Sequence, residues 1–153
     1  MKIEERLEAL GIELRALEAP VANYLHAKVF GDCIYVSGCA PVKDGVSLYR
    51  GRLGRDLTVE EGYQAAREAA VNLISVLKFE LGDLDRVTGI VKLLGFVASA
   101  DDFFQQPAVI NGASDLMVEV FGDAGRHARA AIGVNAIPGD LPVEIEMIAQ
   151  FRD

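Results

Sequence analysis

Apolar residues recur at helical spacing in three parts of the chain. Ile3, Leu7 and Leu10 predict a short N-terminal helix that ends at Gly11. The clearest helix follows Thr58, which forms a capping box with Glu61. Its apolar face is predicted to hold Tyr63, Ala66, Ala70, Leu73, Leu77 and Leu81, and it ends at Gly82. A third helix is expected over about 107–121, with Pro107 in its first turn, Gly122 at its end, and Val109, Ala113, Leu116 and Val120 on one face.

Five stretches predict strands instead. Residues 25–29 and 32–37 are joined by a turn at Gly31-Asp32, and residues 128–136 and 142–151 are separated by Pro138-Gly139-Asp140. The run from Val87 to Val97 is almost continuously apolar, so we expect it to be covered on both faces. Four glycine and proline positions in residues 40–56 predict a long loop, with or without short strands.

The predicted order is β-β-α-β-α-β-β, without repeats or a linker. We therefore expect residues 1–153 to form one domain, with a helix and lead-in over 1–19 and the core over 20–153. This order indicates an α+β sandwich with helices packed on one face of a mixed sheet. The other face is left uncovered within one chain, which favours an oligomer.

Composition narrows the possible partners. The formal net charge is −8 and no basic stripe is visible, so neither RNA nor DNA is expected to bind. No apolar run approaches the roughly 20 residues that cross a bilayer, and the first ten residues do not form a signal peptide, so we expect a cytoplasmic protein without membrane contact. The soft ligands Cys33, Cys39, His26 and His127 lack the spacing of a metal site, and none is expected.

Strand alternation singles out Arg129. Ala130, Ile132, Val134 and Ala136 are predicted to face the helices, which leaves Arg129 on the opposite face with Ala131, Gly133 and Asn135. Small neighbours leave space above the guanidinium, whose donor fork matches a carboxylate or a phosphate. On spacing alone, an ordinary surface arginine or an interface ion pair is the commoner case.

The last strand places two carboxylates on one face. Val143, Ile145 and Met147 are expected to face the core, while Glu144 and Glu146 point outward. Such a pair performs acid–base chemistry when burial raises one pKa, but it is more often a solvated face. Tyr24 and the Ser37-Gly38 pair lie at strand ends, where binding and turn roles are equally common. Asn111 lies inside the predicted helix, where such a residue more often has a structural role.

Several ordered segments together resemble the Rid family, also called the YjgF or L-PSP endoribonuclease family. They are Asn23-Tyr24, the strand IYVSG ending at Gly38, VINGASDLMVEVFG, HARAAIGV around Arg129 and PVEIEMIA around Glu144. The resemblance runs from about residue 20 to the C-terminus and favours a divergent branch. It implies a chorismate-mutase-like fold, a homotrimer with clefts between subunits, and hydrolysis of enamines and imines such as 2-aminoacrylate to 2-keto acids and ammonia without a cofactor.

The resemblance also assigns roles to residues. Arg129 matches the arginine that binds the substrate carboxylate, and Glu144 matches the glutamate that positions or activates water. The pocket-lining positions are matched by Tyr24, Ser37, Gly38 and Asn111, with Cys39 beside them. Cys39 and His26 stand where the family commonly has glutamine, and the loop over 42–58 is longer than usual. These departures leave the substrate open.

Three alternatives remain at this point. The same cleft would serve a trimer that binds a keto acid or a similar metabolite without catalysis. A ribonuclease is suggested by the family's older name, and the acidity of the chain argues against it. A chorismate mutase would be expected to need several cationic anchors, which Arg129 alone does not supply.

Overall fold

In the computed structural model, which describes residues 1–153, the capping box starts helix α2 (Val59–Leu81). The Thr58 hydroxyl accepts from the Glu61 amide at 3.2 Å, and the Glu61 carboxylate accepts from the Thr58 amide at 3.3 Å. The predicted apolar face is buried from Ala66 to Leu81, while Tyr63 lies at its edge. Gly82, with φ of 76°, ends the helix as predicted.

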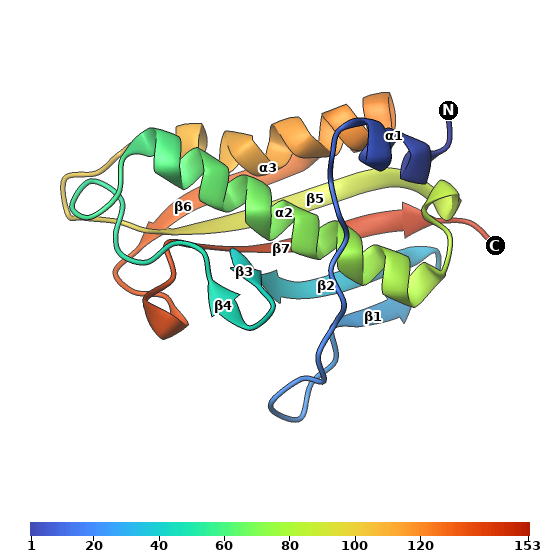
Figure 1. Ribbon diagram of the computed structural model, residues 1–153, viewed down its shortest axis with the longest axis horizontal. Helices are drawn as coiled ribbons and strands as arrows, with labels where there is room; N and C mark the ends of the chain where they lie inside the picture. The colour runs from blue at the N-terminus through green and yellow to red at the C-terminus, as the bar shows by residue number, and fades with distance from the viewer.

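The second long helix, α3 (Gln106–Phe121), also matches its prediction, with Pro107 in the first turn and Gly122 as the C-cap. Its four predicted core residues are all buried. Both helices lie on the same face of the sheet (Figure 1). The short predicted N-terminal helix is α1 (Ile3–Ala9), and its Leu7 joins the core.

One mixed sheet carries these helices, and its strand order is β1-β2-β7-β5-β6. The strands are β1 (Ala27–Phe30), β2 (Cys33–Cys39), β5 (Val87–Ala98), β6 (Ala128–Val134) and β7 (Val143–Phe151). Neighbouring strands run antiparallel except β5 and β6, which are parallel because α3 connects them. The predicted α+β order is therefore confirmed. A small hairpin of β3 (Val42–Lys43) and β4 (Val46–Ser47) interrupts the expected loop.

The lead-in after α1 runs across α2 to the far edge of the sheet (Figure 1). Arg15 attaches it to α2: its amide donates to the Ser75 hydroxyl at 3.0 Å, and its guanidinium binds Glu68 and the Asn72 side-chain carbonyl. This attachment brings the following residues, including Tyr24, to the end of β2.

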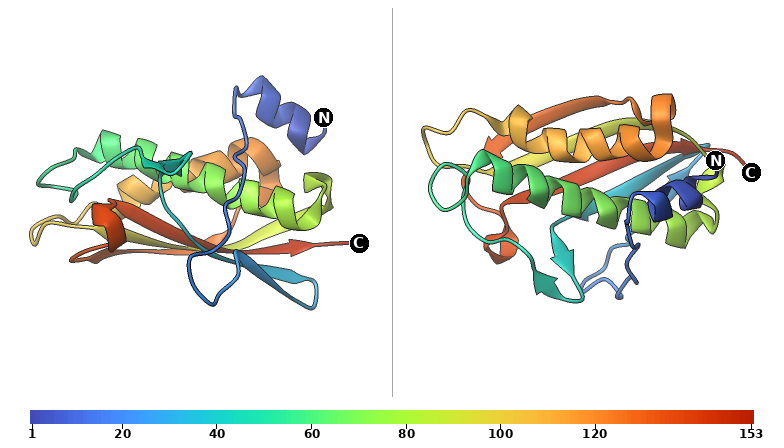
Figure 2. Two further views of the ribbon diagram at one scale, coloured as in Figure 1. Left: turned by 60° about the horizontal axis from the view of Figure 1, so that its bottom comes forward. Right: turned by 45° about the horizontal axis from the view of Figure 1, so that its top comes forward.

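The face of the sheet opposite the helices carries no helix (Figure 2). The expectation that the strand from Val87 is covered on both faces is wrong within this chain. Thr88 and Lys92 are exposed, and Val91 retains 43% of its accessible surface. The apolar run was misleading because some of its side chains face the open side, and a register shift between Ile90 and Lys92 disturbs the alternation. None of the helices is both long and apolar enough to span a bilayer.

The two long helices pack closely at Gly112. A Cβ atom there would lie 2.0 Å from the Tyr63 carbonyl oxygen of α2. Gly112→Ala should therefore lower the free energy of unfolding by about 2–3 kcal/mol, although alanine gains about 1 kcal/mol in an ordinary helix. Urea unfolding measures this change.

Gly89→Ala is the matched control, because the nearest atom to a Cβ at Gly89 is 4.0 Å away. We expect its stability to stay within about 1 kcal/mol of the parent. Equal stability of the two variants would contradict close helix packing at Gly112.

Candidate functional site

Arg129 lies in the edge strand β6, and its side chain runs toward α3. Its Nη1 donates to the Ser114 hydroxyl at 3.1 Å, and its Nη2 donates to the Pro107 carbonyl at 3.4 Å. Ala131 and Gly133 follow on the same face of the strand and offer no long side chain. The guanidinium is partly exposed, so it remains accessible at the edge of the sheet.

The predicted orientation of this strand is wrong. Arg129 and Ala131 face the helix layer, whereas Ile132 faces the open side and keeps 46% of its surface exposed. A Cβ on Gly133 would meet the Gln106 amide of α3 at 2.7 Å, which places that residue on the helix side as well. Both faces of β6 carry small or apolar residues, so hydrophobicity could not tell one face from the other.

Asn111 and His127 are two further polar residues at the side of α3 that borders Arg129. Asn111 is exposed on α3, about one helical turn from both Pro107 and Ser114, so it shares the side of the helix that borders Arg129. His127, which precedes β6, lies with its Nε2 2.9 Å from the Ser114 hydroxyl. We call Arg129, Asn111, Ser114 and His127 the arginine group.

A second group forms where β2 ends beside β7. A Cβ on Gly38 would lie 2.8 Å from the carboxyl carbon of Glu144, so the Glu144 side chain lies directly over Gly38. A register shift between Val36 and Cys39 places Cys39 opposite Ile145. We call Ser37, Gly38, Cys39 and Glu144, together with Tyr24, the glutamate group.

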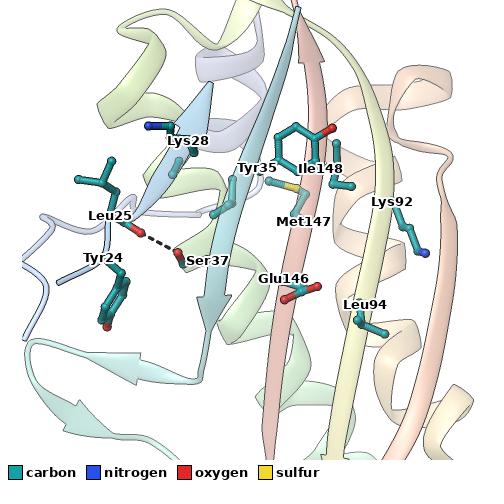
Figure 3. Close-up of a pocket in the computed structure, with 12 residues that line it drawn as sticks. Tyr24, Leu25, Lys28, Tyr35, Ser37, Lys92, Leu94, Glu146, Met147 and Ile148 are labelled. Carbon is teal, nitrogen blue, oxygen red and sulfur yellow. Dashed lines mark hydrogen bonds between the residues drawn. The ribbon is translucent and has the colours of Figure 1, made fainter. Parts of the chain in front are cut away.

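Two pockets border the glutamate group. One, of about 440 Å³, lies on the open face and is lined by Tyr24, Ser37, Lys92 and Glu146 among others (Figure 3). Ser37 is fixed there, because its hydroxyl donates to the Leu25 carbonyl at 2.6 Å (Figure 3).

The other pocket, of about 340 Å³, lies beneath the lead-in. It is lined by Ser37, Gly38 and Cys39, by His26, and by Asp44 of the β3–β4 hairpin. The predicted loop over 42–58 therefore borders this pocket. The His26 ring lies against the Glu18 carbonyl of the lead-in. Neither pocket includes Arg129, Asn111 or Glu144.

Glu144 has the electrostatics of a proton acceptor. Burial raises the pKa of its carboxyl above the usual value, and the negative charge of Glu146 raises it further. A carboxylate with a raised pKa holds a proton more strongly and is a better base near neutral pH. Glu144 and Glu146 both face the open side, as predicted, while Val143, Ile145 and Met147 are buried.

The Cys39 thiol is expected to be unreactive. Burial raises the pKa of its thiol to about 12, and the Glu144 carboxylate contributes to the shift. The reactive form of cysteine is the thiolate, which at pH 8 would be only about 10⁻⁴ of such a thiol. We therefore expect iodoacetamide at pH 8 to label native protein at the less buried Cys33 and to label Cys39 only after denaturation. Peptide mass spectrometry measures this, and equal labelling of both thiols in the native state would contradict it.

The arginine and glutamate groups do not meet within one chain. Arg129 aligns with Leu93 and Met147 across the sheet, and Glu144 lies three residues before Met147 and faces the opposite side. Two strand spacings and three residue rises put the two Cα atoms roughly 14 Å apart. One small substrate therefore does not touch both groups of the same chain. No cluster of three or more His, Cys, Asp or Glu side chains is arranged to hold a metal ion.

The sequence did not assign a role to Ser114, which binds Arg129, or to His127, which binds Ser114. Their contact joins residues 13 positions apart in different elements, so no local motif reveals it. The alternation of side chains along a strand could have indicated His127, because it lies two residues before Arg129 and so faces the same side.

Comparison with known proteins relates the chain to one family. Residues 4–147 match the family model described as "YjgF/chorismate_mutase-like, putative endoribonuclease". Protein TCP17 of Trypanosoma cruzi is 42% identical over 153 residues, which cover 99% of this chain and 96% of that protein.

Solved structures are similar to the chain along most of its length. The protein Atu1372 "with unknown function" from Agrobacterium tumefaciens has a TM-score of 0.90 at 43% identity, covering 98% of this chain and 92% of that one. A "putative endoribonuclease" from Shewanella oneidensis has a TM-score of 0.95 at 36% identity, covering 99% and 100%. The YjgF gene product of E. coli, at 23% identity and a TM-score of 0.62, covers 88% and 92% and shares the fold. The expected chorismate-mutase-like α+β fold is therefore confirmed.

Proposed function

Because the chain belongs to the YjgF/Rid family, we propose that it hydrolyses reactive enamines and imines of the 2-aminoacrylate type to 2-keto acids and ammonia. The observation that carries the proposal is the position of Arg129, a partly exposed guanidinium beside small residues at the edge of the sheet. A 2-amino acid derivative carries a carboxylate that fits this donor fork.

The chemistry needs an anchor and a base, and no cofactor. The enamine tautomerises to the imine, and water attacks the α-carbon while Glu144 accepts a proton from it. Glu144 passes this proton to the nitrogen, which gives a carbinolamine. The carbinolamine hydroxyl then gives its proton to Glu144 as the carbonyl forms and the C–N bond breaks, and Glu144 passes that proton to the nitrogen, which leaves as ammonia. Arg129 holds the carboxylate throughout, so the reacting carbon stays oriented toward the water.

Both groups act on one substrate only if they come from different copies. We therefore propose a homotrimer in which the arginine group of one subunit faces the glutamate group of its neighbour across a cleft. The uncovered sheet face supports association, because it presents apolar side chains such as Tyr35 and Ile132, which are 45% and 46% exposed. Light scattering after size exclusion measures the mass, which should be three times the 16.5 kDa of one chain.

Turnover is tested by coupling the protein to an amino acid oxidase or a dehydratase that generates the imine or enamine. The protein should accelerate 2-keto acid release above the spontaneous rate. Equal rates with and without it, across several amino acids, would contradict the proposal.

Binding without turnover is the competing function, and it uses the same anion site. In that case a keto acid would raise the melting temperature without any gain in release. RNA cleavage is disfavoured by the net charge of −8 and by the absence of a basic stripe.

A further inference from the structure

Arg129 is the first member of a hydrogen-bond chain that passes from β6 to α3 and back. Its Nη1 lies 3.1 Å from the Ser114 hydroxyl oxygen, which lies 2.9 Å from His127 Nε2. His127 Nδ1 in turn lies 2.7 Å from the Gly125 carbonyl oxygen. Ser114 and His127 are both partly buried, so these hydrogen bonds are partly shielded from bulk water.

The Gly125 carbonyl at the end of this series of hydrogen bonds determines which group donates at each step. A carbonyl oxygen only accepts, so His127 Nδ1 carries the proton and donates to Gly125. The neutral ring then has a lone pair on Nε2, which accepts the Ser114 hydroxyl proton. The Ser114 oxygen is left with lone pairs for the Arg129 N–H, and each donor has one acceptor.

The electrostatics favour the neutral ring. Burial lowers the pKa of His127, the bond to Gly125 acts in the opposite direction, and the positive charge of Arg129 lowers it again. Asp123 and Arg126, in the exposed turn before His127, pair with each other. A neutral ring is required for Nε2 to accept from Ser114.

We propose that Ser114 and His127 are positioning residues that hold the Arg129 guanidinium in the orientation that receives the substrate carboxylate. This inference rests on the proposed function of Arg129. An arginine side chain is flexible, and binding costs less when its rotamer is already restricted. The hydrogen bond to Ser114 holds Nη1 of Arg129, and Nη2 makes only the long contact to Pro107. Part of the donor fork is therefore left for a ligand.

Removing the hydroxyl tests the inference. Ser114→Ala should raise the Kd for 2-oxobutyrate, and the KM for the imino acid, about three- to tenfold while kcat stays unchanged. Ser114→Thr keeps the hydroxyl and should restore the parent values. In ¹⁵N NMR, the Arg129 guanidinium should rotate slowly in the parent and faster in Ser114→Ala.

The histidine supplies a pH test. As pH falls through the lowered pKa of His127, the ring gains a proton on Nε2 and no longer accepts from Ser114. The Kd for 2-oxobutyrate should then rise more steeply in the parent than in His127→Gln, whose amide oxygen accepts without titrating.

Three results would overturn the assignment. One is the same guanidinium rotation in the parent and in Ser114→Ala. Another is unchanged 2-oxobutyrate affinity in Ser114→Ala while Arg129→Ala loses it, which leaves the proposed function standing. The third is a burst of nitrophenolate from nitrophenyl acetate that Ser114→Ala removes, because Ser114 would then be a nucleophile. If the parent neither accelerates 2-keto acid release nor binds 2-oxobutyrate, the proposed function fails, while guanidinium rotation still decides whether Ser114 orders Arg129.

Discussion

Arg129→Ala should lower kcat/KM for the imino acid about 10²- to 10³-fold. A bidentate contact between guanidinium and carboxylate contributes two charge-assisted hydrogen bonds, each of about 1.5–3 kcal/mol, and part of this is lost to solvent at an exposed edge. A loss of about 3–4 kcal/mol corresponds to that range. Steady-state rates of 2-keto acid release measure it.

Arg126→Ala is the matched control for Arg129. Its side chain is 72% exposed, and its ion-pair partner is Asp123 in the same turn. We expect it to keep the parent kcat/KM. Arg129→Lys should fall between the two, because lysine keeps the charge and loses the planar fork. Full activity in Arg129→Ala would contradict its role as the carboxylate anchor.

Glu144→Gln should lower kcat at least about 100-fold and leave 2-oxobutyrate affinity unchanged. The amide keeps the size of the side chain over Gly38 but cannot accept the proton of the attacking water, a contribution that is commonly about 10²–10⁴-fold. This variant also separates the two candidate functions, because a binding protein without turnover has no rate to lose. Calorimetry gives the affinity and the coupled assay gives kcat.

Glu146→Gln is the control for Glu144, and it adds a pH test. Glu146 is exposed on the same face, and its negative charge raises the pKa of Glu144. Activity needs ionised Glu144, so the rate should fall as pH falls through that raised pKa. Removing the Glu146 charge lowers the pKa of Glu144, so the acidic limb should move to lower pH. An unmoved limb would contradict Glu144 as the titrating base.

Local chemistry explains why the helices could be predicted. The Thr58–Glu61 capping box, Pro107 and Gly122 begin or end helices through contacts with residues close to them in sequence. Their partners can therefore be read from sequence spacing. The outward direction of Glu144 was also predictable, because the alternate positions Val143 and Ile145 are plainly apolar.

Features that depend on distant partners were not predictable. The orientation of β6 was misjudged because Ala130 and Ala131 are chemically identical and only contact with α3 distinguishes their faces. The contact of Gly38 with Glu144 and that of Ser114 with His127 join separate elements. The family resemblance implied a shared site for Arg129 and Glu144, and the geometry adds that they lie on opposite faces of the sheet within one chain.

A crystal structure of the protein soaked with a 2-keto acid such as 2-oxobutyrate shows where the carboxylate binds. We expect the ligand in a cleft between subunits, its carboxylate within hydrogen-bond distance of Arg129, and a water on Glu144 of the neighbouring subunit. A carboxylate bound elsewhere, with Arg129 making only its contacts to α3, would contradict the role of Arg129 as the anchor.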